Sequence, residues 1–270
     1  MRAAAALACV AIAASSCIGN PSAAAPAHVY LIVMENHSAD EALQGAYTSD
    51  LAARYGVAEN YTAVAHPSVP NYLALTSGQT WGVTDDSYHS LPRADLGDQL
   101  TSAGIKWRAY MEGLTDAGCI DSPPPYDPGH NPFAYYGGGC PNNVVPLSQL
   151  RSDISAGDVR FSWIGPDMCH DEHNCSVSTG DDWLRGVVGT ITSAPSWKPG
   201  AVLFITWDED DGSGDNRVLT LVITPDLGHA VSSVAYNHYS LLATIEDLLR
   251  LPRLANAASA KAMTDLVSNP

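Results

Sequence analysis

The chain has 270 residues, of which 46% are hydrophobic and 16% are charged, and its formal net charge is −16. This composition is typical of a folded protein with a sizeable core and argues against a disordered chain. The excess of acidic residues disfavours nucleic acid and anionic membrane surfaces as electrostatic partners. No Gly/Ser-rich or Pro-rich linker divides the middle of the sequence, so we expect one large domain.

The first 25 residues have the pattern of a secretory signal peptide. Arg2 is followed by an Ala-rich apolar stretch and then by small residues, which is the order of regions in such a signal. We therefore expect a secreted protein whose mature domain covers residues 26–270. A lipoprotein anchored through Cys17 is the weaker alternative, because the expected Leu is missing before it. The apolar stretch is too short to span a bilayer, and no later segment is long enough.

Removal of the signal leaves an even number of cysteines, namely Cys119, Cys140, Cys169 and Cys175. In an oxidising compartment two disulfides are the default, and three pairings are possible. We favour Cys119 with Cys140 and Cys169 with Cys175, because each bond would staple an irregular stretch. The alternative is a zinc site in which Cys169 and Cys175 act together with His170 and His173. Export weakens the zinc interpretation, because the cysteines of a secreted protein are expected to be oxidised.

Apolar runs rich in β-branched residues predict buried strands at residues 28–36, 105–111, 159–165, 201–207 and 217–225. Between and after them, the apolar spacing predicts helices at residues 96–104, 146–154, 181–191 and 238–252. This alternation indicates an α/β fold with a mainly parallel sheet sandwiched by helices. Residues 113–146 are rich in Gly, Pro and Tyr, so we expect a long loop or cap over the sheet edge.

Polar residues follow several predicted strands, where parallel sheets place their ligands. Glu35 and Asn36 follow the first strand, residues 167–173 follow the third, and four acidic residues at 208–211 follow the fourth. Four adjacent carboxylates repel one another unless they are hydrated or bind a cation, so we expect a hard divalent metal there. The alternatives are a solvated acidic turn and a stand-alone calcium loop, but the spacing differs from that of an EF-hand.

Ser68 lies between Pro67 and Pro70, directly before a predicted helix. We expect it at the N-cap, where free backbone N–H groups and the helix dipole favour a phosphate. The simpler alternative is that Ser68 only caps the helix. A histidine beside carboxylates, such as His173 near Asp171, has a raised pKa suited to protonating a leaving oxygen.

Six ordered segments carry a resemblance to a known family, and they read VMENHS, HPSVPNYLALTSG, HNPFAYY, DEHNCSVSTGDDWL, TWDEDDG and NHYSLLATIEDLLRLP. They resemble the phosphoesterase family of secreted acid phosphatases and bacterial phospholipases C, within the alkaline-phosphatase-like superfamily. The similarity is strongest to small secreted acid phosphatases that act on phosphoinositides such as phosphatidylinositol 3-phosphate. It covers most of the mature chain and implies an alkaline-phosphatase-like fold.

The resemblance implies a site with one divalent ion, Mg²⁺, Ca²⁺ or Mn²⁺, with Ser68 as both nucleophile and ligand. The remaining metal ligands would be Glu35, Asn36, Asp208 and Glu209. The residues expected around the substrate phosphate are Asn71, His130, His173 and His238, with His66 and Asp171 as further substrate contacts. His173 is the first candidate for the general acid and His130 is the second. Metal coordination would lower the pKa of the serine hydroxyl enough for attack.

We therefore predict a monomeric, metal-dependent acid phosphatase that hydrolyses small-molecule or lipid phosphate monoesters through a phosphoserine. A phospholipase C-type phosphodiesterase is the alternative within the same family. A non-catalytic, calcium-stabilised exported binding protein is the alternative of another class. A sulfatase is set aside because Tyr72 stands where that family needs Arg. Two-zinc alkaline phosphatases need more His and Asp ligands and usually begin with an Asp where this chain has Glu35, so we expect one metal.

Overall fold

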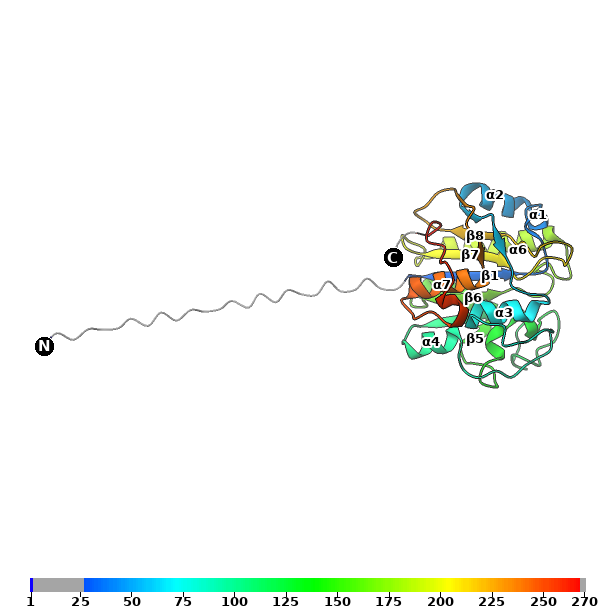
Figure 1. The fold of residues 1–270 in the computed structure, drawn as a ribbon. Coiled ribbons are helices and arrows are strands. Elements are labelled where there is room, and N and C mark those ends of the chain that lie inside the picture. Colours follow the sequence, from blue (N-terminus) through cyan, green and yellow to red (C-terminus); the bar gives the residue numbers. More distant parts are fainter. Residues whose placement is uncertain (2–26, 268–270) are drawn as a thin grey trace.

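The computed structural model describes Met1 and residues 27–267. The predicted signal peptide, residues 1–25, falls outside them apart from Met1, as do Cys9 and Cys17. The described chain forms an eight-stranded sheet with the strand order β5-β4-β6-β1-β7-β8-β2-β9 and a separate pair, β10-β3 (Figure 1). The first strand of the sequence thus lies in the middle of the sheet.

The strands are β1 Val29–Met34, β2 Gly56–Ala58, β3 Tyr61–Thr62, β4 Trp107–Met111, β5 Val144–Pro146, β6 Phe161–Gly165, β7 Val202–Trp207, β8 Thr220–Ile223, β9 Ala230–Ser232 and β10 Tyr236–Asn237. The α-helices are α1 Ala39–Ala42, α2 Ala46–Arg54, α3 Ser68–Ser77, α4 Leu96–Ser102, α5 Leu150–Ala156, α6 Val177–Thr192 and α7 His238–Leu249. Short 3₁₀ helices span Pro128–His130, Pro132–Ala134, Leu147–Gln149 and Ala255–Ala258.

The mainly parallel sheet that the apolar runs predict is confirmed. β5, β4, β6, β1 and β7 all run parallel, and β8 pairs antiparallel with both β7 and β2. All five predicted strands are present, and the four predicted helices correspond to α4, α5, α6 and α7. The sequence pattern missed the short strands β2, β3, β9 and β10, because two or three residues are too few to establish an alternation.

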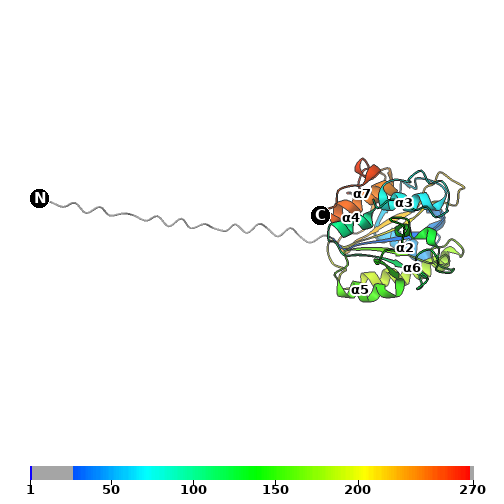
Figure 2. The same ribbon diagram turned by 90° about the horizontal axis from the view of Figure 1, so that it is seen from below.

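Helices cover both faces of the sheet (Figure 2). α3, α4 and α7 lie on one face, and α5 and α6 lie on the other. α2 packs against α6, and α3 packs against α7. All ten residues of α3 are buried, as expected for a helix enclosed between the sheet and a neighbouring helix. At its C-terminus, Gly78 adopts a left-handed conformation with φ 72°, and an added Cβ would lie 2.5 Å from the Leu254 carbonyl oxygen.

The central pair β1 and β7 brings two acidic side chains together. The two strands are parallel, and Met34 is the register partner of Trp207. The next residues, Glu35 and Asp208, therefore leave the sheet side by side at its carboxyl edge. The amide of Asp208 donates to the Met34 carbonyl oxygen at 2.9 Å, which continues the ladder up to the first carboxylate.

Both favoured disulfides are present. Cys119 bonds to Cys140 and Cys169 bonds to Cys175. The first bond closes the irregular segment between β4 and β5. The predicted loop at residues 113–146 contains two 3₁₀ turns, and its last three residues form the edge strand β5. Among the described residues, every helix is too short or too polar to cross a bilayer.

Glu246 is a fully buried carboxylic acid on α7. One oxygen accepts a hydrogen bond from the Leu254 amide at 2.8 Å, and the other is buried without a partner. Burial raises the pKa of Glu246 to about 8 from an ordinary 4.5, against the smaller opposing effects of the Leu254 bond and Arg253. The folded state therefore keeps a proton that the unfolded state releases.

Between pH 4.5 and pH 8, stability contributed by this proton falls as pH rises, since the folded state binds more protons than the unfolded state. We predict that Glu246→Gln flattens this part of the pH dependence. Between pH 5 and pH 8, the free energy of unfolding of the parent protein should fall more than that of the variant. The difference between the two falls should be roughly 2 kcal/mol or more. Urea denaturation of both proteins at the two pH values measures the difference, and parallel pH profiles would contradict the prediction.

Candidate active site

Ser68 is the first residue of α3, and the N-cap is Pro67. The expectation that Ser68 caps the helix is therefore wrong by one position, and the contacts of its hydroxyl go to other side chains. The reason is that Pro67, in an extended conformation, already ends the preceding loop. The hydroxyl is consequently free to face other groups.

The Ser68 hydroxyl faces a ring of acceptor oxygens. Its Oγ lies 3.2 Å from Glu35 Oε2, 3.3 Å from Asn36 Oδ1 and 3.1 Å from Glu209 Oε1. One hydroxyl proton can satisfy only one of these oxygens at a time. The other oxygens thus approach the hydroxyl without a proton between them.

Asp208 completes this group of oxygens. Its Oδ1 accepts a hydrogen bond from the Asn36 amide at 3.1 Å, whereas its Oδ2 is buried without a partner. Burial and then repulsion from Asp208 raise the pKa of Glu35 well above its ordinary value. Burial, with repulsion from Glu209, raises the pKa of Asp208 to about 7, and burial also raises the pKa of Glu209 to about 7.

These residues fit a hard divalent cation. An unpartnered buried carboxylate oxygen and several closely spaced acceptors are costly unless a positive charge lies among them. The donors are carboxylate, amide and hydroxyl oxygens, which are the ligands that Mg²⁺, Ca²⁺ and Mn²⁺ prefer. The structure thus brings together all five residues of the predicted metal set: Glu35, Asn36, Ser68, Asp208 and Glu209.

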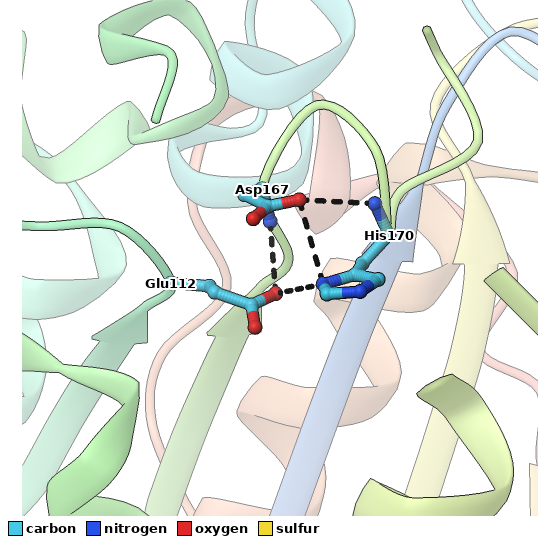
Figure 3. A group of neighbouring side chains, drawn as sticks. All are labelled: Glu112, Asp167 and His170. Atoms are coloured by element: carbon cyan, nitrogen blue, oxygen red, sulfur yellow. Dashed lines mark hydrogen bonds and ion pairs between the residues drawn. The ribbon is translucent and has the colours of Figure 1, made fainter. Parts of the chain in front are cut away.

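A second group of possible ligands consists of Glu112, Asp167 and His170 (Figure 3). Their ligand atoms lie within 4.8 Å of one another, the one such group of His, Cys, Asp and Glu in the described residues. His170 Nδ1 lies 3.0 Å from Glu112 Oε2, which also accepts from the Asp167 amide at 3.2 Å. Glu112 follows β4, and the other two follow β6, so the group links the ends of neighbouring strands. Its internal hydrogen bonds account for its compactness.

The zinc alternative for this loop is wrong, because Cys169 and Cys175 are joined in a disulfide and offer no thiolate. The bond closes a small loop that contains His170, Asp171 and His173. Asp167 Oδ1 accepts hydrogen bonds from the amides of Cys169 and His170, at 3.0 Å each. The loop is therefore fixed at its base.

His130 lies between two carboxylates. Its Nε2 is 3.3 Å from Glu35 Oε1, and its Nδ1 is 2.9 Å from Asp171 Oδ2. Burial lowers the pKa of His130, but the attraction of Glu35 and the bond to Asp171 outweigh it and raise the pKa to about 10. His130 is thus a buried cation that neutralises part of the acidic group.

Asp171 is a correction to the predicted substrate contacts. The residue is 1% exposed, and its oxygens are engaged by His130 and by the His173 amide at 2.8 Å. It therefore orients two histidines instead of reaching the substrate. The His173 side chain itself is exposed, and its ring centroid lies 5.9 Å from that of His130, which leaves it open to a bound ligand.

Asn71 is a second correction. Its Oδ1 accepts from the amides of Val64 and Ala65 at 3.0 Å each, and its Nδ2 donates to the carbonyl oxygens of Ala65 and Pro67. The side chain is fully buried. Its hydrogen bonds are used to fix the loop that enters α3, so the structure places it as a support for Ser68 and not as a phosphate ligand.

His238 is the third correction. It is 0% exposed, its Nε2 lies 2.6 Å from the Asp208 carbonyl oxygen, and its Nδ1 lies 3.0 Å from the Tyr61 hydroxyl. Burial lowers its pKa to about 4. Both ring nitrogens are engaged, so His238 is a neutral residue that holds the backbone of Asp208 and does not reach a phosphate.

The acidic residues at 209–211 make different contacts. Glu209 Oε2 lies 2.6 Å from His66 Nδ1, and Asp210 Oδ1 lies 3.3 Å from His66 Nε2. The His66 side chain is 43% exposed, and both of its ring nitrogens lie against these carboxylates. Asp210 also accepts hydrogen bonds from the amides of Gly212 and Asn216 and thereby shapes the turn, while Asp211 is exposed.

Tyr72 is a site residue that sequence reasoning missed. Its hydroxyl donates a short hydrogen bond to Glu35 Oε1, and its ring stacks on His130 with a centroid distance of 5.5 Å. It lies four residues after Ser68 on α3, and this spacing places both side chains on one helix face. That spacing was the signal that could have found it.

The comparisons with known proteins agree with this geometry. Residues 33–252 match the model of the phosphoesterase family. The chain is 30% identical to a phosphatidylinositol-3-phosphatase of Mycobacterium tuberculosis over 262 residues, which cover 92% of this chain and 86% of that protein. It is 25% identical to a probable acid phosphatase of Kluyveromyces lactis and 24% identical to an acid phosphatase of Aspergillus fumigatus, of which it spans 62% and 58%.

Solved structures share the fold. An alkaline phosphatase superfamily protein from Vibrio parahaemolyticus superposes with a TM-score of 0.59 at 13% identity, covering 90% of this chain and 72% of that one. Murine ectonucleotide pyrophosphatase/phosphodiesterase 5, solved as an inactive variant with AMP, gives a TM-score of 0.62 at 10% identity, covering 87% and 99%. The chain therefore belongs to the phosphoesterase family and is a hydrolase of phosphate esters.

Proposed function

We propose that the chain is a secreted acid phosphatase that hydrolyses phosphate monoesters, phosphoinositides included, through a phosphoserine at Ser68. The observation that carries the proposal is the ring of acceptor oxygens from Glu35, Asn36 and Glu209 around the serine hydroxyl. The relatives named acid phosphatase and phosphatidylinositol-3-phosphatase support a monoester substrate over a diester.

In the proposed reaction, Ser68 Oγ attacks phosphorus and passes its proton to a neighbouring carboxylate. The nearest carboxylate oxygens belong to Glu209 and Glu35, at 3.1 and 3.2 Å from Oγ, which supports this transfer. A bond forms between Oγ and phosphorus while the bond from phosphorus to the ester oxygen breaks. A divalent cation held by Glu35, Asn36, Asp208 and Glu209 would supply a lowered pKa for the hydroxyl and positive charge near the phosphate oxygens.

The departing ester oxygen needs a proton, and His173 is the proposed donor. Its side chain is exposed and lies beside His130, and Asp171 fixes the positions of both residues. Water then attacks the phosphorus and gives a proton to the deprotonated His173, while the bond between phosphorus and Ser68 Oγ breaks. The carboxylate returns its proton to Oγ, so inorganic phosphate leaves and the Ser68 hydroxyl is restored. A protonated donor makes activity favour acidic pH.

The proposal includes the organisation of the chain. Residues 26–270 form a phosphoesterase domain that acts as a monomer after removal of the signal peptide, residues 1–25. The two disulfides are consistent with an oxidising compartment outside the cytosol.

Ser68→Ala should lower the turnover of a chromogenic phosphomonoester by at least about 10³-fold, because it removes the atom that bonds to phosphorus. Steady-state rates of hydrolysis of p-nitrophenyl phosphate measure the effect, and bis(p-nitrophenyl) phosphate is the diester used for comparison. Ser155→Ala is the control, since Ser155 is exposed on α5 and bonds only to the Arg151 carbonyl oxygen.

Equal rates for the parent protein and Ser68→Ala would instead support the calcium-stabilised binding protein. Faster cleavage of the diester would support the phosphodiesterase. Acid quenching during turnover, followed by peptide mapping, should locate phosphate on Ser68 in the parent protein.

Removal of divalent cations with a chelator should lower activity by at least about 100-fold, and Mg²⁺, Mn²⁺ or Ca²⁺ should restore it. Asp208→Asn should lose the bound metal, because it removes charge from the buried oxygen that lacks a partner. Glu112→Gln is the matched control and should keep one metal per chain, since Glu112 belongs to the separate group. Elemental analysis and activity check both variants, and the reverse pattern would place the metal at Glu112.

A further inference from the structure

Asp86 is an exposed carboxylate on the loop that follows α3. Its Oδ1 accepts a hydrogen bond from the amide of Val69 at 3.0 Å. Val69 directly follows Ser68 in the first turn of α3. An acidic side chain of the protein is therefore bound at the helix end that carries the nucleophile.

The amide that Asp86 occupies is one of very few at this helix end. The first amides of a helix have no partner within it and attract anions. Pro70 has no N–H group, so the first three positions of α3 offer only the amides of Ser68 and Val69. One of these two donors is already bound to a carboxylate.

Asp86 also brings a negative charge to the first turn of α3, beside Ser68. The Ser68 hydroxyl already contacts a second carboxylate, Glu209 Oε1, at 3.1 Å. A phosphoryl group on Ser68 would lie close to Glu209 and one residue from the amide that Asp86 binds. Two negative groups close to a phosphate weaken its binding unless a cation outweighs them.

We propose that Asp86 weakens the hold of the site on phosphate, by keeping the Val69 amide occupied and by placing a like charge beside the phosphoryl group. This inference rests on the proposed function of Ser68. Its consequence for the reaction is faster release of inorganic phosphate, which is the product that the remaining positive groups of the site would otherwise retain.

The test measures inhibition by inorganic phosphate in the cation-loaded protein and in three variants. Asp86→Asn removes the charge but keeps an acceptor, and Asp86→Ala removes both. The inhibition constant for phosphate should fall roughly three- to tenfold in each, the range expected when one unit charge beside an anion is removed at a solvated surface. KM should fall in parallel, while kcat stays constant or falls.

Asp85→Asn is the matched control. Asp85 is the neighbouring carboxylate, but it bonds to the Ser87 amide and to His89, so its removal should change phosphate inhibition less than twofold. Thermal unfolding of every variant shows whether the fold is kept. A cap with only a structural role would lower the melting temperature of Asp86→Ala and leave the inhibition constant unchanged.

Unchanged or weaker phosphate inhibition in both Asp86 variants would overturn the inference. Calorimetric titration with inorganic phosphate measures the same affinity without turnover. A parent protein that hydrolyses no phosphate ester would contradict the proposed function, whereas Asp86 variants that bind phosphate no more tightly than the parent would contradict this inference alone.

Discussion

The site depends on repulsion among buried carboxylates. The pairing of parallel strands holds these carboxylates close together at the carboxyl edge of the sheet. Because β1 and β7 run parallel in a fixed register, Glu35 and Asp208 emerge together, and Glu209 follows directly. Buried carboxylates must gain a proton, a positive side chain or a cation. His130 supplies one positive charge between Glu35 and Asp171. The remaining negative charge makes the surroundings of Ser68 suited to a metal ion and keeps the serine hydroxyl among strong acceptors.

A rigid frame maintains this unfavourable arrangement of charge. Asn71 fixes the loop before Ser68, His238 fixes the backbone of Asp208, and Asp171 fixes two histidines. Each of these side chains is buried and uses its hydrogen-bonding groups on the protein itself. The polar residues of the site therefore divide into a layer that faces the ligand and a layer that holds the first one in position.

The parts of the fold and site that follow from local pattern could be predicted from the sequence. Long apolar runs identify strands such as β1 and β7, and the polar residues after them identify Glu35 and Asp208. The roles of Asn71, Asp171 and His238 could not be predicted. The sequence shows that a polar residue lies near a site, but it does not show whether the side chain points at the ligand or at the backbone. The location of Asp86 at the start of α3 depends on the path of a loop, and loop paths have no periodic signal.

The burial of α3 restricts how this protein can diversify. All ten residues of that helix are enclosed, so almost any replacement within it would disturb the packing of the core. The loop that follows α3 and carries Asp86 is exposed and irregular, and loops of this kind vary in length and composition. Differences between related proteins are therefore expected in such loops, while Ser68 stays anchored to an interior that tolerates little change.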